Sequence, residues 1–550
     1  MRTTGTVLTV TCALAVTLIV SQSTPAEAVD GLTWELVTIP GLPAGSTAWR
    51  VWTDQPNSAY VWAVRTLPGT TTVPESFLYH WDGVNWIQEL HLSGYSGDAL
   101  FGTGPADIFA SVSGCDRTTD VSCSPAPESF IYHFDGSAWT PQTLPPAARY
   151  EPVTSISGIP EDVIAATAYH NILRNIMGGG WNVAFTPGNI RNILLLAPDD
   201  AYFTGCNRRG WWDGTSWHDG YGGNPCDMYD LWGMRDSAGV LHMYTVGNPG
   251  YSYYVGVWRY AEGSHWYSEV FRDASSPSYE AGSAYGVWGS APDDVYVAGR
   301  RGDWSVPLNG AIYHFDGTGW QRLWEVGSIP NVEDVWGSSA YDVWFTLGNG
   351  QLLHLHDTTP PILDACPVAG PFIQGSGPQT VGPIGVDASV SGLDAGASAL
   401  TGLVETASVG SRSVTFTAVD NAGNSASATC SYQVIFDWAG FFQPATNPPV
   451  LNQVKAGQAI PMKFSLAGNQ GLDILAAGSP ASQQIACDSS APVDDIEQTV
   501  TAGNSSLSYD PASDQYTYVW KTGKAWTGTC RQLIVALADG TEQRANFKFK

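Results

Sequence analysis

The chain has few charged residues, and few of those are basic. Only 14% of its 550 residues are charged, with 24 Lys and Arg against 51 Asp and Glu, which gives a formal net charge of −27. Residues 29–357 contain no lysine. Binding to nucleic acid requires a basic surface that neutralises phosphates. The sequence therefore argues against a nucleic-acid partner and, on the same ground, against an anionic membrane.

Long apolar runs are scarce as well. Arg2 precedes an apolar run over residues 7–20, and residues 26–28 (Ala-Glu-Ala) form a small-x-small cleavage site. Residues 1–28 are therefore interpreted as a secretory signal peptide. The run is shorter than the ~20 residues that a transmembrane helix needs, and no later stretch approaches that length. We expect a secreted, extracellular or surface-associated protein without a transmembrane segment in the mature chain, kept soluble and monomeric by its acidity.

Motifs for cofactor chemistry are missing. The sequence has no Ser-nucleophile elbow, zinc-binding helix motif, phosphate loop or dinucleotide fingerprint. No cysteine has the C-x-x-C plus His spacing of a zinc site. We expect no cofactor and no metal, with one alternative left open. Asp420, Asn421 and Asn424 are able to donate oxygens to Ca²⁺, but a plain turn is favoured because Asn, Gly and Asp form tight turns without an ion.

Glycine, proline and tryptophan are abundant, with 60, 35 and 23 copies, which favours many short strands joined by tight turns. Removing Cys12 with the signal peptide leaves an even number of cysteines, and this favours disulfides in an exported protein. The predicted pairs are local in sequence: Cys115 with Cys123, Cys206 with Cys226, Cys366 with Cys430, and Cys487 with Cys530.

Two patterns alternate through residues 29–357 and indicate a repeat. The first is a strand, an Asp-Gly turn and a strand: residues 312–320 read IYHFDGTGW, echoed by IYHFDGSAW at 131–139 and LYHWDGVNW at 78–86. The second, VWGSAPDDVYVAG at 287–299, is an apolar strand, a Pro-Asp turn and another apolar strand. Each pattern occurs seven times. The tryptophans that end the copies of the first are Trp34, Trp86, Trp139, Trp181, Trp217, Trp266 and Trp320.

The two ends of the repeat region complement each other. The last unit, residues 335–356, has three strands and no Trp strand, whereas a spare Trp strand stands at Trp34. Placing Trp34 beside residues 352–356 completes the last blade and pairs edges that would otherwise be open. The predicted fold is all-β: a seven-bladed β-propeller at 29–357 closed by its N-terminal strand, an Ig-like β-sandwich at 358–435 and a C-terminal β domain at 436–550.

Three resemblances accompany these patterns. The strand pairs resemble the repeats of secreted bacterial β-propellers, which implies an architecture and no particular activity. The strands at 414–419 and 430–434 give residues 358–435 a resemblance to a bacterial Ig-like or HYR-type module. The segments 461–466 (PMKFSL) and 516–521 (YTYVWK) make residues 436–550 similar to the PxKF modules of actinobacterial secreted proteins. Both C-terminal modules are interpreted as spacers or surface-association units.

The candidate binding residues lie in loops of the propeller. The loops that join second to third strands, and one blade to the next, share one face, which we call the loop face; the hairpin turns share the opposite turn face. The planar guanidinium of arginine binds carboxylates through two parallel hydrogen bonds and stacks on aromatic rings. Arginines and aromatic residues in these loops are therefore the expected ligand contacts. Acids in the same loops offer the alternative of weak surface ion pairs. The predicted ligand-binding residues are Arg149, Tyr150, Arg208, Arg209, Tyr253, Arg300, Arg301 and Trp304.

The sequence predicts a secreted binding or adhesion protein whose loop face contacts an extracellular ligand, a carbohydrate or else a surface protein. One alternative is a polysaccharide lyase or glycosidase at the same face. His170 is its candidate catalytic residue, because it stands outside the blade repeat to which His80, His133 and His314 belong. A second alternative is a scaffold for protein contacts.

Overall fold

The computed structural model describes residues 31–550 apart from 69–72, 115–127, 207, 222–226, 249–254, 263–265, 270–281, 304–305, 327–328, 330, 369 and 502–505. The chain divides into two compact units, Met1–Thr358 and Thr359–Lys550. Strands make up nearly all of the regular structure, and one 3-10 turn, η1, covers Lys524–Trp526. No helix in the described part of the chain has the length and hydropathy to cross a membrane.

The first unit consists of seven four-stranded antiparallel sheets, which we number as blades in chain order. Blade 1 consists of β2 (Thr47–Trp52), β3 (Ala59–Thr66), β4 (Pro74–Trp81) and β5 (Trp86–Ser93). Blade 2 consists of β6 (Tyr95–Gly104), β7 (Asp107–Gly114), β8 (Phe130–Phe134) and β9 (Trp139–Thr143). Blade 3 consists of β10 (Val153–Ile159), β11 (Asp162–Thr167), β12 (Ile172–Ile176) and β13 (Asn182–Phe185).

Blades 4 to 7 follow the same order, except that the outermost strand of blade 7 comes from the N-terminus. Blade 4 consists of β14 (Ile190–Ala197), β15 (Asp200–Gly205), β16 (Arg208–Trp212) and β17 (Trp217–Tyr221), and blade 5 of β18 (Asp227–Arg235), β19 (Leu241–Asn248), β20 (Gly256–Ala261) and β21 (Tyr267–Glu269). Blade 6 consists of β22 (Gly282–Ala291), β23 (Asp294–Asp303), β24 (Val306–Phe315) and β25 (Trp320–Val326). Blade 7 consists of β26 (Val332–Ser339), β27 (Asp342–Leu347), β28 (Gln351–His356) and β1 (Thr33–Thr38).

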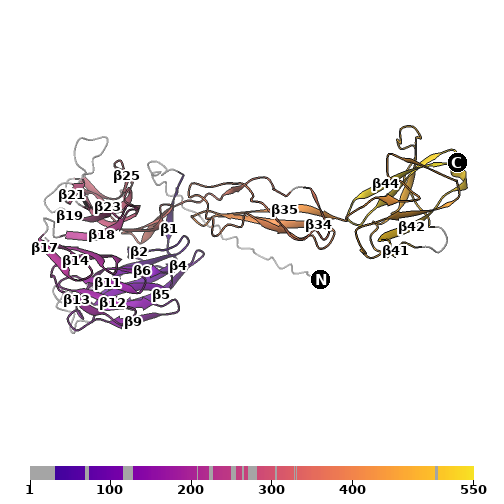
Figure 1. The fold of residues 1–550 in the computed structure, drawn as a ribbon. Coiled ribbons are helices and arrows are strands. Elements are labelled where there is room, and N and C mark those ends of the chain that lie inside the picture. The colour runs from indigo at the N-terminus through magenta and orange to yellow at the C-terminus, as the bar shows by residue number, and fades with distance from the viewer. Residues whose placement is uncertain are drawn as a thin grey trace, which may run out of the picture. The chain divides into compact units, whose positions relative to one another are not determined.

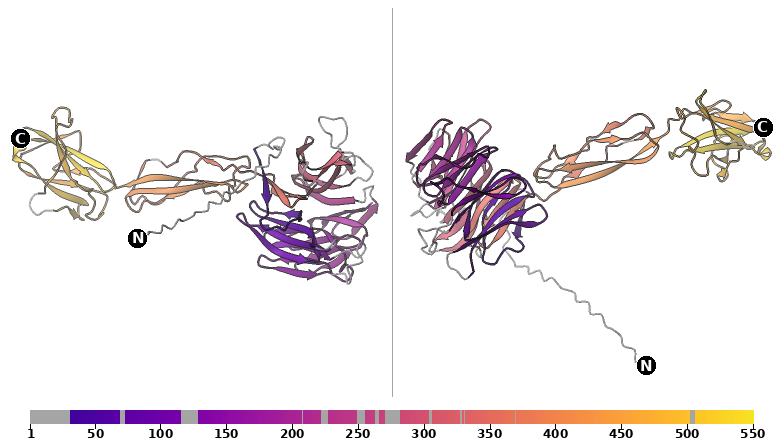
Figure 2. Two further views of the ribbon diagram at one scale, coloured as in Figure 1. Left: turned by 180° about the vertical axis from the view of Figure 1, so that it is seen from behind. Right: turned by 90° about the horizontal axis from the view of Figure 1, so that it is seen from below.

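The blades form a closed ring. The first strand of each blade contacts the first strand of the next, from β2 through β6, β10, β14, β18 and β22 to β26, and β26 in turn contacts β2. The sheets are arranged around a common centre in Figures 1 and 2. The predicted seven-bladed propeller is therefore confirmed.

The N-terminal strand closes the last blade, as predicted. β1 runs antiparallel to β28, with Trp34 opposite Leu355. The Trp34 ring packs on the propeller core, with its centroid 5.7 Å from that of Phe345. This pairing covers edges of β1 and β28 that would otherwise expose unpaired backbone groups.

The repeated residues explain why each blade folds locally. In the Asp-Gly turns the aspartate accepts backbone N–H groups two and three residues ahead, as Asp82 does from Val84 and Asn85 at 2.8 and 2.6 Å. The following glycine, Gly83, has a φ of 88°, a conformation that favours a residue without Cβ. The same aspartate bonding recurs at Asp135, Asp213 and Asp316.

The repeated histidines are structural, as expected. His133 and His314 each approach the aspartate that follows the first strand of their blade, Asp107 and Asp294, at 2.6 Å. Each imidazole also stacks on an aromatic ring of the second strand, with centroids 4.5 and 4.3 Å apart. His80 stacks in the same way on Tyr60, at 4.0 Å. These contacts join the hairpin turn to the third strand.

The second unit contains small sheets, mostly antiparallel but with two parallel strand pairs, around two hydrophobic clusters, one including Phe416 and Val434 and the other Phe464, Trp520 and Phe547. Its first strands are β29 (Ile362–Leu363), β30 (Pro371–Ile373), β31 (Gln379–Val381), β32 (Val386–Asp387), β33 (Gly402–Val404), β34 (Gly410–Val419) and β35 (Ser425–Ile435). The remaining strands are β36 (Phe441–Phe442), β37 (Leu451–Val454), β38 (Ala459–Phe464), β39 (Ala481–Ile485), β40 (Glu497–Gln498), β41 (Ser508–Asp510), β42 (Gln515–Lys521), β43 (Cys530–Ala536) and β44 (Glu542–Phe549).

The two segments that carry the PxKF resemblance are neighbours in space. β38 pairs with β42, so Phe464 lies opposite Tyr516 and Met462 opposite Tyr518. The predicted boundary between residues 435 and 436 stays a prediction, as do the module families. At the possible Ca²⁺ site, the Asp420 carboxylate accepts the N–H groups of Ala422 and Asn424 at 3.0 and 2.8 Å, which is the bonding of a tight turn.

Two predicted disulfides are confirmed. Cys366 is bonded to Cys430 and Cys487 to Cys530, with Cα separations of 5.6 and 5.3 Å. Cys206 is also disulfide-bonded. Its predicted partner Cys226, and the predicted pair Cys115 and Cys123, lie outside the described residues.

Removing residues 29–40 deletes β1 and should open the ring. We expect a loss of about 3 kcal/mol or more in the free energy of unfolding, because the Trp34 packing and the β1–β28 ladder are lost together. Thermal melting and light scattering should show a lower melting temperature and aggregation, in comparison with a chain that starts at Val29. Equal melting of the two chains would contradict the closure.

Candidate functional site

Most predicted arginines of the loop face are paired with local acids. Arg149 lies 3.3 Å from Glu128, and Arg301 lies 3.2 Å from Glu325. Arg300 lies over the Tyr285 ring at 5.8 Å from its centroid. Exposed pairs of this kind contribute little free energy. The structure therefore gives these arginines local partners, and whether they contact a ligand stays a prediction.

The remaining predicted residues are scattered. The side chain of Tyr150 is exposed, whereas Tyr253 and Trp304 lie outside the described residues. His170 lies on the loop face of blade 3, where its Nδ1 is 2.7 Å from Glu151. Glu151 is also a partner of Asn171 at 3.1 Å, so the pair belongs to a local loop network.

Arg208 and Arg209 have different surroundings. They are consecutive in β16, and successive residues of a strand point to opposite faces of the sheet. Arg208 forms an ion pair with Asp219 of β17. Arg209 faces blade 5, where it lines a groove, and forms no ion pair with any residue in the described part of the chain. Only one member of this predicted pair is therefore an unpaired cation.

The groove between blades 4 and 5 is lined by aromatic side chains. Its cavity volume is about 360 Å³. Blade 4 contributes Tyr202 and Trp211, which are opposite each other in register, and blade 5 contributes Tyr260 and Trp266, whose ring centroids are 5.5 Å apart. Trp211 is 47% exposed, and its ring stacks on that of His218. The rings provide flat apolar surface in a cleft of a size that suits small ligands.

A buried polar atom accompanies these rings. Thr204 lines the same groove and is only 2% exposed, yet its Oγ1 has no hydrogen-bond partner among the described residues. A buried polar group without a partner costs free energy, which a ligand hydroxyl or carboxylate would recover. Because Thr204 is opposite Arg209 in register, the unpartnered hydroxyl and the unpaired cation are neighbours.

At the turn face the groove adjoins a second hollow of about 700 Å³ that shares Tyr202 and Trp211. Arg235 organises this end: its guanidinium lies 2.7 Å from Asp200 and 2.8 Å from Glu262, and it donates to the Tyr202 hydroxyl at 3.1 Å. Hydrogen bonds from Leu241 N–H and from Arg235 hold the pKa of Glu262 below its usual value. The groove therefore has at one end a cation without an ion-pair partner in the described part of the chain, and at the other an ionised, internally paired network.

Sequence reasoning missed this groove because its walls come from two different blades. The only local signal was a pair of tryptophans, Trp211 and Trp212, beside Arg209. Gly210 allows β16 to pack closely on β15, since a Cβ at this position would approach the Phe203 ring to 2.2 Å. A larger residue at this position would displace β16 from β15.

A second polar region lines the centre of the ring. The pairing of the first two strands is irregular in all seven blades, where a β-bulge interrupts the register near the loop-face end. Bulges redirect side chains. Here the redirected residues bond to the next blade: Asp230 accepts from Val287 N–H at 2.9 Å, and Asp334 from Val51 N–H at 3.0 Å.

These carboxyls surround Arg50. Arg50, Asp230 and Asp334 line a central cavity of about 210 Å³, and Arg50 lies 3.6 Å from Asp334. Burial raises the pKa of both Asp230 and Asp334, although Arg50 opposes the shift. In the bulge of β6, burial raises the pKa of Asp98 to about 7, and its Oδ2 has no hydrogen-bond partner among the described residues. Carboxyls that stay protonated near neutral pH are able to act as acids.

Comparison with known proteins gives only distant structural likenesses. No family model and no curated protein matches the chain. Among solved structures it is similar to YCF48 bound to D1 peptide (14% identity, 61% of this chain and 99% of that chain, TM-score 0.42) and to YCF48 from Cyanidioschyzon merolae (14%, 59% and 98%, 0.40). It is also similar to an α-L-arabinanase from Penicillium chrysogenum complexed with arabinobiose (11%, 61% and 99%, 0.32). At these scores the likenesses carry no argument about function.

Replacing Asp98 with Asn should change how stability depends on pH. The folded pKa of about 7 is above the ordinary value of 3.8, so the folded chain retains a proton that the unfolded chain releases. The resulting stability is fully present below about pH 4 and is lost as pH rises through about 7. Relative to Asp98→Asn, the native protein should thus lose about 4 kcal/mol between these limits, because each pH unit between the two pKa values is equivalent to about 1.4 kcal/mol. Urea unfolding at several pH values tests this, and a difference independent of pH would contradict it.

Proposed function

We propose that this is an exported binding protein that holds an acidic carbohydrate in the groove between blades 4 and 5. The observation that carries the proposal is the meeting of Arg209, unpaired among the described residues, and the unpartnered Thr204 hydroxyl with five aromatic side chains in one groove. The predicted signal peptide and the two confirmed disulfides support an extracellular setting.

The chemistry of a sugar fits these surfaces. A pyranose ring presents C–H groups on its faces and hydroxyls around its rim, so its faces suit the rings of Trp211 and Trp266 while its rim suits Thr204 and Arg209. An arginine fork binds a carboxylate with two parallel hydrogen bonds, which favours a uronic acid at the Arg209 end.

The charge of the whole chain sets a limit on the ligand. With a formal net charge of −27, the protein repels long polyanions. A ligand held through one local cation should therefore be a short or sparsely charged saccharide. A densely sulfated polymer would meet repulsion from the acidic residues outside the groove.

Changing Arg209 or Trp211 to Ala should weaken binding of uronic-acid oligosaccharides about 5- to 150-fold, since each contributes on the order of 1 to 3 kcal/mol. A glycan array on the full mature chain would select the ligand, and calorimetry would measure the dissociation constants. The melting temperature of the Arg209 variant should stay near that of the native protein, because no described contact is lost.

Two matched variants control this experiment. Arg208→Ala removes the neighbouring arginine on the opposite face of β16, and Trp49→Ala removes an exposed tryptophan of blade 1; both should bind normally. If Arg208→Ala and Arg209→Ala weaken binding equally, the groove is not the site. A blank array combined with capture of a protein would instead favour the scaffold alternative.

The central cavity supports a second candidate function, hydrolysis or elimination at a polysaccharide. Two carboxyls with raised pKa values and an arginine line one cavity, an arrangement that suits general acid–base catalysis of glycosidic bonds. Their bonds to Val287 and Val51 show, however, that both acids also join blades. The groove remains the primary proposal, because Arg209 and the Thr204 hydroxyl have no such structural partners among the described residues.

If the cavity is catalytic, Asp334→Asn should reduce turnover at least about 100-fold, while Arg209→Ala should reduce only binding. The Asn oxygen is still able to accept the Val51 N–H, so folding should be retained. Reducing-sugar release and ultraviolet absorbance of unsaturated products measure the two reaction types. Absence of turnover by the native protein on every saccharide that it binds would remove this candidate.

A further inference from the structure

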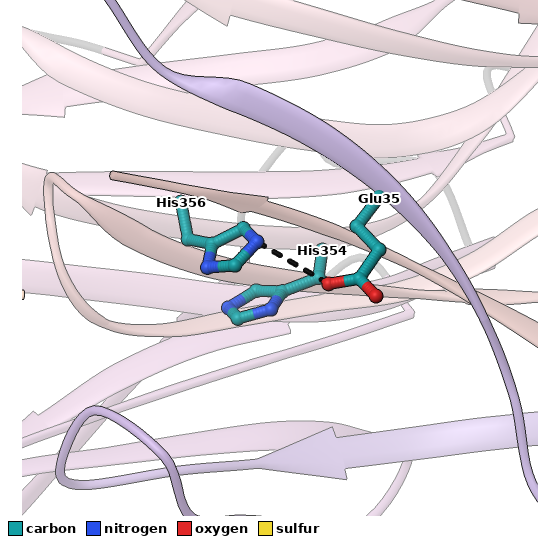
Figure 3. Close-up of side chains that lie close together, drawn as sticks. All are labelled: Glu35, His354 and His356. Carbon is teal, nitrogen blue, oxygen red and sulfur yellow. Dashed lines mark ion pairs between the residues drawn. The ribbon is translucent and has the colours of Figure 1, made fainter. Parts of the chain in front are cut away.

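The seam where the chain ends meet contains a cluster of ligand-type side chains. Glu35 of β1 lies directly opposite His354 of β28, and His356 is two residues further along β28 on the same face of the sheet. Figure 3 shows the two imidazoles side by side with the Glu35 carboxylate directed toward them. One ligand atom from each of these residues lies within 4.8 Å of the others.

The contact between Glu35 and His356 is long, and no hydrogen bond satisfies the His356 nitrogen in the described part of the chain. His356 Nε2 is 3.4 Å from Glu35 Oε2 and is buried without a hydrogen-bond partner among the described residues. The two imidazole rings are stacked with centroids 3.8 Å apart.

The His354 ring is held in place by two neighbours. Its Nε2 lies 2.6 Å from Asp342, which leaves Nδ1 as the other ring nitrogen, and the imidazole stacks on Trp344 at 3.7 Å. Metal-binding histidines usually bond through their second nitrogen to a carboxylate, which fixes the tautomer and the ring orientation. The repeated His–Asp pair of the blades therefore supplies the outer support of the site.

The blade repeat accounts for His354 but not for the other two residues. His133 and His314 occupy the same place in blades 2 and 6, where the residue two positions later is the turn-forming aspartate, Asp135 or Asp316. In blade 7 the outer strand comes from the N-terminus and no Asp-Gly turn joins it to β28. At this one seam His356 replaces the aspartate, and Glu35 faces it.

We propose that Glu35, His354 and His356 bind one divalent transition-metal ion of the Zn²⁺ type, which links the first strand of the propeller to the last. Imidazole and carboxylate ligands suit zinc, and three protein ligands leave a fourth position for water. Glu35 is exposed, so the ion is able to enter from solvent. The ligands come from opposite ends of the propeller sequence, so the site exists only in the closed ring.

Metal binding should therefore stabilise closure. An ion that binds the folded but not the unfolded chain shifts the unfolding equilibrium by mass action. For a unit of this size, Zn²⁺ at about 100 times its dissociation constant should raise the melting temperature by about 4 °C.

Cobalt spectroscopy on the untagged full mature chain tests the site directly. After treatment with a chelator and its removal, Co²⁺ should produce the visible absorption of a four-coordinate site, saturate at one equivalent and be displaced by Zn²⁺. Glu35→Gln and His356→Gln should each weaken Zn²⁺ binding at least about tenfold and abolish the rise in melting temperature. His91→Gln, which removes a half-exposed histidine of blade 1, should behave like the native protein.

Two results would contradict the proposed metal site. Absence of the cobalt spectrum and of tight zinc binding in the native protein would overturn the proposal without any variant. Equal binding by the native protein and by both variants would place the ion elsewhere and would also overturn it. His354 is left unchanged, because its contacts with Asp342 and Trp344 also support the blade.

Discussion

Closure of the ring by β1 is the constraint on which the rest of the propeller depends. The first strand of each blade contacts the first strand of the next, so a ring with an incomplete blade would expose the edge of β28 and the core beneath Trp34. Pairing of β1 with β28 removes that edge and joins two segments that are far apart in sequence. The same seam brings Glu35 beside His354 and His356, so the proposed metal site and the stability of the fold are coupled.

Polar bonds around the centre reinforce the ring. Bulges in the first strands direct Asp230 and Asp334 to backbone N–H groups of the next blade, while Arg50 compensates part of their charge. Acids at a propeller centre are easily interpreted as catalytic. Here their backbone bonds give them a structural role as well, and any catalytic role has to be compatible with those bonds.

Function is best sought where a blade departs from the repeat. Most blades bury their facing surfaces against each other, but blades 4 and 5 leave a groove lined by rings, with Arg209 and Thr204 unpartnered among the described residues. Blade 7 departs at His356 and Glu35. Side chains that the repeat requires, such as His314 with Asp294, already have structural partners. Side chains outside the repeat have donor or acceptor capacity left for a ligand.

The sequence alone determined the number of blades, the closing strand at Trp34, the Asp-Gly turns and two disulfides, because these depend on local patterns and on counting copies. It did not determine that Arg208 is paired with Asp219 while Arg209 faces a groove, because strand alternation separates neighbours only once the sheet is formed. Nor did it predict that Glu35 faces His354 and His356, because the predicted pairing of the Trp34 strand with residues 352–356 did not fix the register between them. Contacts between blades and between chain ends depend on how the ring closes, so only the tertiary structure decided which side chains share a site.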